Sequence, residues 1–244
     1  MTLSHTMLQV VVVLSLAGFV QGLTGFGFGL AAVALLPLVL ELKDAQVVVA
    51  LMNVVVCLVT FLATWRHFRW RDGRGLVLGS VVGVPLGFFA LVWLPAAFLL
   101  RALGLLLCLF SASELWRGER VLFRIPVAWG FPLGVAGGCL GGALNVGGPP
   151  TVAYAYSQPW TKEQIVSLMQ VCFGLTAVFR LGLMLNTDLI RPDLLRVSVL
   201  ATAPLLVTTW LGSLLLKRVP QDKLKIGVFA FLFVMGLKYL FFTH

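Results

Sequence analysis

Charged residues are scarce in this sequence. Of its 244 residues, 11% are charged and 60% are hydrophobic, and the mean hydropathy is +1.02. A soluble domain carries about 25% charged residues, so this chain has too little polar surface to cover a water-soluble body. The composition therefore excludes a soluble globular protein and predicts an all-α polytopic membrane protein.

Acidic side chains and histidines are missing from the apolar runs. All nine Asp and Glu lie in loops or at the ends of runs, and His5, His67 and His244 lie outside them. A buried proton relay requires such groups, and so does a cation site built from carboxylates. The sequence also lacks a Ser/His/Asp set, an HExxH motif and a P-loop. We expect no enzyme activity, no cofactor and no metal site.

Paired cysteines and a signal peptide are absent as well. Cys57, Cys108, Cys139 and Cys172 lie in apolar runs without CxxC spacing. The simple interpretation is small core side chains, and a redox or metal role stays an open alternative. No Lys or Arg precedes the first apolar stretch, so the N-terminus does not resemble a cleavable signal peptide.

Eight runs of low charge follow one another along the chain. Six have the length of one spanning helix of about 20 residues: 46–63, 75–94, 98–115, 164–186, 197–216 and 224–241. The runs 8–40 and 127–157 would measure roughly 45–50 Å as unbroken helices, against a hydrocarbon core of about 30 Å. Glycine-rich segments at 22–29 and 137–150 interrupt them. We expect each half, of about 11–14 residues, to be too short to span, which predicts two re-entrant hairpins.

The chain then divides into two repeats, 1–115 and 116–244, within one integral membrane domain. Each repeat is predicted to contain a broken re-entrant hairpin followed by three transmembrane helices. Local matches support this division. "LMNV" at 51–54 corresponds to "LMQV" at 168–171, and the spacing from Gly87 to Pro95 equals that from Gly212 to Pro220.

The basic residues predict the orientation. Loops 64–74, 116–126 and 217–225 are rich in Lys and Arg, whereas 41–45, 95–97 and 187–196 are nearly neutral. The positive-inside rule places the first group in the cytoplasm and both termini outside. It also explains the net charge of +9 without a nucleic-acid partner. The two repeats then have inverted topology, which is typical of secondary transporters with a site near the membrane midplane.

The two glycine-rich tips are the candidate site. A new helix is expected after each set of glycines, and helix N-termini offer N–H donors and partial positive charge. Two such ends approaching from opposite sides would bind an anion. The candidate substrate-binding residues are Gln21, Thr24, Gly25, Gly27, Gly29, Asn145, Gly147, Gly148 and Pro149, together with Asn53 and Gln170 in the spans that follow. For the glycines the alternative is close helix packing, and for Asn53 and Gln170 it is an interhelical hydrogen bond.

Arg180 is the basic residue well inside a run. An intramembrane charge suggests a role in attracting the anion. Snorkelling of the side chain to the membrane interface is the alternative.

Three segments carry a resemblance to a known family. "VQGLTGFGFGL" followed by Pro37, "HFRWRD" and "GGALNVGGPPTVAYAY" resemble the sulfite exporter TauE/SafE family, also called the toluene sulfonate uptake permease family. The resemblance covers essentially the whole chain. G-F-G-F-G and GGPP stand where many members have three glycines, which is similar to the branch described as probable membrane transporters. The resemblance implies a bacterial inner-membrane permease for sulfite, sulfonates or related anions, with its substrate residues at the two tips.

These observations together predict a secondary transporter (permease or exporter) that moves sulfite or an organosulfonate across the cytoplasmic membrane. The expected partners are the small anionic substrate and membrane lipids, with homo-oligomers left open. Two alternatives remain: a channel-like anion uniporter on the same scaffold, and a non-transporting membrane scaffold subunit.

Overall fold

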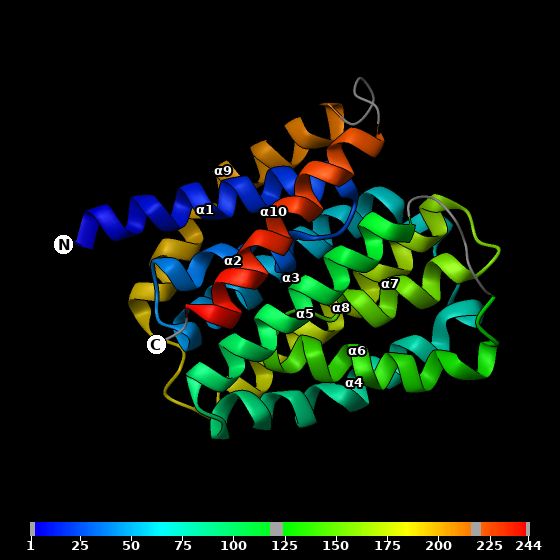
Figure 1. Cartoon of the computed structure of the whole chain (residues 1–244), viewed down its shortest axis with the longest axis horizontal. Coiled ribbons are helices and arrows are strands. Elements are labelled where there is room, and N and C mark those ends of the chain that lie inside the picture. Colours follow the sequence, from blue (N-terminus) through cyan, green and yellow to red (C-terminus); the bar gives the residue numbers. More distant parts are fainter. Residues whose placement is uncertain (1–2, 118–123, 216–220, 243–244) are drawn as a thin grey trace. The chain divides into compact units, whose positions relative to one another are not determined.

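The computed structural model describes residues 3–117, 124–215 and 221–242. All regular elements in these ranges are helices (Figure 1). Their bounds are α1 Leu3–Thr24, α2 Phe28–Leu35, η1 Leu36–Leu38, α3 Leu42–Thr64, η2 Trp65–His67, α4 Trp70–Trp93, α5 Ala96–Arg117, η3 Val127–Trp129, α6 Gly130–Leu144, α7 Gly148–Ser157, α8 Lys162–Met184, α9 Pro192–Leu215 and α10 Gln221–Phe241. Residues 118–123 and 217–220 of the basic loops used above for the orientation, with Pro220 of the repeat match, lie outside the described residues, as does His244.

Seven helices within the described ranges are long and apolar enough to cross a membrane, and two shorter apolar segments accompany them, Phe28–Leu38 and Ile226–Phe241. The prediction of an all-α multi-pass membrane protein is confirmed. Each of the six runs of single-span length also contains a helix, although α3 begins at Leu42, ahead of Lys43 and Asp44. Charge marks the end of an apolar run, but it does not end a helix.

Both overlong runs are interrupted, but the two parts of each are unequal. The first part of each, α1 with 22 residues and the segment Val127–Leu144 with 18, is long enough to span. The second parts, α2 with 8 residues and α7 with 10, are short. The expectation that every half is too short is therefore wrong for the first parts. The reasons differ: α1 begins at Leu3, ahead of its apolar run, whereas the second break falls at 145–147, late in its glycine-rich segment.

The chain forms two compact units, each drawn from both halves of the sequence. The first comprises residues 1–49, 94–118 and 189–244, and the second comprises 50–93 and 119–188. Among the described residues, the first unit holds α1, α2, α5, α9, α10 and the start of α3, while the second holds the rest of α3 with α4, α6, α7 and α8.

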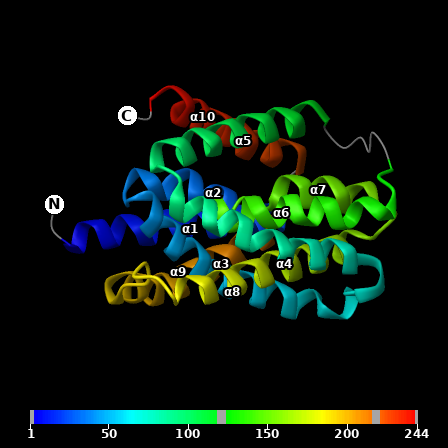
Figure 2. The same ribbon diagram turned by 90° about the horizontal axis from the view of Figure 1, so that it is seen from below.

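Glycines bring helices close together inside the first unit, where α1 packs on α9 (Figure 1). A Cβ added at Gly22 would overlap the Thr209 carbonyl of α9, and one at Gly212 would overlap the Phe19 carbonyl of α1. The same unit pairs α5 with α10 (Figure 2), where a Cβ on Gly104 would lie 2.7 Å from the Gly236 oxygen. Small residues permit such backbone approach.

In the second unit, α4 packs on α6 along a longer glycine seam. On α4, Cβ atoms at Gly79, Gly83 and Gly87 would overlap carbonyl oxygens of α6. On α6, Gly134, Gly138 and Gly142 meet carbonyls of α4 in the same way. For Gly22, Gly138 and Gly142, the packing interpretation is therefore the one that the structure supports.

Candidate functional site

The first glycine-rich turn joins α1 to α2 through residues 25–27. Gly25 has φ 78° and Gly27 has φ 114°, a region that side chains with a Cβ rarely adopt. Gly27 caps the N-terminus of α2, and Gly29 lies in the first turn of that helix. The alternation of glycine and phenylalanine thus has a local cause, because Phe26 and Phe28 are buried while the glycines supply the reversed backbone.

Two polar side chains stabilise this turn by hydrogen bonds. Gln21 is 4% exposed; its amide oxygen accepts from the N–H of Phe28 at 3.0 Å, and its amide nitrogen donates to the Gly25 carbonyl at 3.3 Å. The Thr24 hydroxyl contacts the carbonyl oxygens of Val20 and Phe26. Sequence reasoning placed both residues at the site, and the structure brings them together with Gly25 and Gly27 in one turn.

The second turn joins α6 to α7 through residues 145–147. Asn145 ends α6 in the left-handed conformation at φ 56°, which Asn tolerates better than most residues. Its N–H donates to the Gly141 carbonyl at 3.0 Å, and that of Val146 to Leu140 at 3.3 Å. This arrangement satisfies the last carbonyls of α6.

Helix α7 begins at Gly148, with Gly147 as its N-cap. Pro149 and Pro150 occupy the next positions and have no N–H. This end therefore offers fewer donors than the tip prediction assumed: Gly147 and Gly148 can donate, whereas Pro149 contributes only shape.

Arg180 of α8 points at the end of α6. It is 0% exposed, and its guanidinium donates to the carbonyl oxygens of Gly141 at 3.2 Å and Ala143 at 3.4 Å. A snorkelling side chain keeps its head group in water, so that alternative is wrong. The sequence could not have revealed these partners, because any residue supplies a carbonyl.

Asn53 and Gln170 both belong to the second unit. The amide oxygen of Asn53 in α3 lies 3.5 Å from the Cys57 sulfur in the same helix. Gln170 in α8 is 2% exposed. Their part in a substrate site stays a prediction.

The fold and the turns define a multi-pass membrane protein with two helical runs interrupted by glycine-rich turns. The family model for sulfite exporter TauE/SafE matches residues 10–239. The chain therefore belongs to the TauE/SafE family, which is a family of membrane exporters and not of enzymes.

A curated relative agrees with this assignment. Over 182 residues the chain is 31% identical to the probable sulfite/organosulfonate exporter TauE of Cupriavidus necator. The match covers 72% of this chain and 66% of that protein, a little under two thirds of the relative's length. No solved structure matches the chain.

Proposed function

We propose that this protein is a secondary transporter that exports sulfite or an organosulfonate across the bacterial cytoplasmic membrane. Family membership supports export of a sulfur oxyanion, and the name of the Cupriavidus necator relative covers both classes of substrate. The observation that carries the proposal for this chain is the charge at the second glycine-rich turn.

That charge can be estimated from three contributions. Arg180 supplies one full positive charge, because a guanidinium stays protonated in proteins. The C-terminus of α6, where Arg180 binds carbonyls, carries roughly half a negative charge, and the N-terminus of α7 roughly half a positive one. The sum is clearly positive. The carbonyl acceptors of Gly141 and Ala143 bind the two terminal nitrogens of the guanidinium without cancelling its charge, so this turn favours an anion and disfavours a cation.

The first turn contributes donors instead of charge. Gln21 occupies the Phe28 N–H, and the next N–H groups of α2, those of Gly29 and Leu30, have no carbonyl acceptor within their own helix. We propose that these groups, together with the N–H groups of Gly147 and Gly148, donate hydrogen bonds to the transported anion near the membrane midplane. That both turns serve one anion is inferred from the sequence pattern.

The inverted repeat is part of the same proposal. If α1 corresponds to α6 and α4 to α9, the pairing of α1 with α9 corresponds to the pairing of α6 with α4. Helices α5 and α10 are the equivalent last helices of the two repeats, and they pair with each other. Each pair joins the first half of the chain to the second, as expected for two related halves that exchange helices. We further propose that the short second parts, α2 and α7, are the re-entrant segments, that both termini face outside, and that transport proceeds by alternating exposure of the anion site.

Sulfite flux in proteoliposomes tests the role of Arg180. Substitutions such as Gly27→Val and Gly147→Val are poor tests, because Gly27 has φ 114° and a Cβ on Gly147 would lie 2.7 Å from the Gly137 oxygen. Arg180→Lys keeps the charge and Arg180→Gln keeps a donor without the charge. Gly182→Ala in the same helix meets nothing within 4 Å and serves as the control.

We expect Arg180→Gln to lower the flux about tenfold or more, which corresponds to about 1.4 kcal/mol of lost anion stabilisation. Arg180→Lys should retain most of the flux, and Gly182→Ala all of it. Equal flux through the Lys and Gln variants would contradict the electrostatic role. Thermal unfolding of each variant distinguishes lost transport from lost folding.

A further inference from the structure

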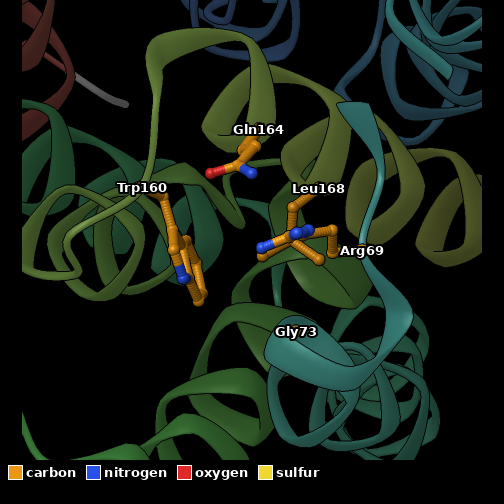
Figure 3. A pocket seen from close by; sticks show the side chains of 5 residues that line it. All are labelled: Arg69, Gly73, Trp160, Gln164 and Leu168. Atoms are coloured by element: carbon orange, nitrogen blue, oxygen red, sulfur yellow. The ribbon is translucent and has the colours of Figure 1, made fainter. Parts of the chain in front are cut away.

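A small pocket lies in the second unit, away from both glycine-rich turns in the sequence. Its interior measures about 10 Å³, room for roughly one water molecule, and the rest of it is an open mouth; it is lined by Arg69, Gly73, Trp160, Gln164 and Leu168. Figure 3 shows the Trp160 ring and the Arg69 side chain facing each other across the pocket, with Gln164 beside both. Nothing in the proposed transport mechanism uses these residues.

The orientation of the Gln164 amide is fixed by the start of α8. Thr161 caps this helix: its hydroxyl accepts from the Gln164 N–H at 3.3 Å, and the Gln164 amide oxygen accepts from the Thr161 N–H at 3.0 Å. This reciprocal capping box occupies the oxygen of the amide. The amide nitrogen, with its two donors, is the part of Gln164 left for a ligand.

The remaining walls of the pocket are cationic and aromatic. Arg69 adds a planar group of N–H donors that matches oxyanions. Trp160 packs edge-on against the buried Tyr154, with ring centroids 5.9 Å apart, so its indole is a fixed apolar wall. Segments 64–74 and 158–164, which supply the polar walls, contain five Lys or Arg and two Asp or Glu. The pocket thus combines donors, positive charge and an apolar surface.

We propose that the open mouth of this pocket, between Arg69, Gln164 and Trp160, binds the oxyanion head group of an amphipathic molecule, with the organic part against Trp160. The chemistry fits a sulfonate or a phosphate monoanion equally well. The source is either the organosulfonate that the protein transports, captured before transport, or an anionic membrane phospholipid. The first source rests on the proposed function, and the second does not. The Lys and Arg distribution assigns this end of the unit to the cytoplasmic side, where an exported anion enters.

Two substitutions remove the head-group interactions. Gln164→Glu keeps the capping box, because Glu serves at that position as well as Gln, but replaces the amide donors with a negative charge. Arg69→Gln removes the guanidinium. Arg71→Gln is the matched control, because it changes the net charge equally on an exposed neighbour that does not line the pocket.

The experiment measures dissociation constants for the purified full-length protein in a neutral detergent. The probes are toluenesulfonate and dioctanoyl phosphatidylglycerol, with dioctanoyl phosphatidylcholine as the zwitterionic comparison. We expect at least one anionic probe to bind about tenfold or more weakly to Gln164→Glu and to Arg69→Gln. Arg71→Gln should stay within about twofold of wild type. The anionic probe whose affinity the two pocket substitutions weaken shows whether the ligand is an organosulfonate or a phospholipid.

Equal affinity of all four proteins for both anionic probes would overturn the pocket assignment, and so would the absence of binding to wild type. Sulfite flux measured on the same preparations separates this outcome from failure of the proposed function. If Arg180→Gln stops the flux while pocket variants leave binding unchanged, the pocket assignment fails and transport stands. If wild type binds phosphatidylglycerol through Arg69 and Gln164 but carries no anion, the proposed function fails and the pocket stands.

Discussion

Replacing Gln21 by Leu should destabilise the protein by opening the first glycine-rich turn. The substitution keeps a side chain of similar size but removes both hydrogen bonds of the amide, to Phe28 and to Gly25. Loss of the acceptor leaves the buried Phe28 N–H without its partner, which costs about 1–3 kcal/mol, and loss of the longer bond to Gly25 costs about 0.5–1.5 kcal/mol. We expect a total loss of about 2–4 kcal/mol in the free energy of unfolding.

Thermal unfolding in detergent measures this loss. For a chain of this size, about 2–4 kcal/mol corresponds to a decrease of roughly 4–16 °C in Tm. Hydrogen exchange adds a local readout, because the amides of 25–29 should exchange faster while those of α9 stay protected. The matched control is Gln9→Leu, in the same helix, whose half-buried side chain has no role in the turn. If Gln21→Leu unfolds at the wild-type temperature, Gln21 does not hold the turn.

Three further substitutions test the packing and the backbone. Gly138→Ala should cost about 1–3 kcal/mol through overpacking, because its Cβ would overlap a carbonyl of α4, and the unfolding temperature should drop relative to Gly182→Ala. Gly27→Ala should cost about 1–3 kcal/mol for holding alanine at φ 114°; wild-type stability would contradict the observed turn. Arg191→Gln removes an exposed ion pair to Asp44 at 2.7 Å, so chemical denaturation should detect a loss of less than about 1 kcal/mol, and 1 M salt should abolish the difference.

The number and position of the helices were predictable, because hydrophobic runs between charges report directly on what can lie in lipid. The expected run 164–186 became α8, Lys162–Met184. Both breaks were also predictable from their glycines, although positive φ explains these glycines in the first break alone: Gly25 and Gly27 take it there, whereas Asn145 takes it in the second break. The exact residues of the second break within 137–150 were not, because other glycines of that segment serve packing: Gly138 and Gly142 stay helical and pack against α4.

The sequence did not specify which helices pack against each other. Glycines spaced four apart on α4 predict a flat helix face, but many helices could lie against it, and nothing local specifies α6 over another. Arg180 shows the same limit, since its carbonyl acceptors have no sequence signature. The Thr161–Gln164 capping box is the opposite case, because the spacing of these two residue types is a recognisable helix start.

The proposed function depends most directly on movement of a sulfur oxyanion. The measurement is efflux of radiolabelled sulfite from proteoliposomes loaded with it, compared with protein-free liposomes and with efflux of choline from a parallel preparation. We predict that wild-type protein accelerates sulfite efflux, that excess organosulfonate competes with it, and that choline is retained. Sulfite efflux equal to that of protein-free liposomes, or efflux of choline instead, would contradict the proposed function.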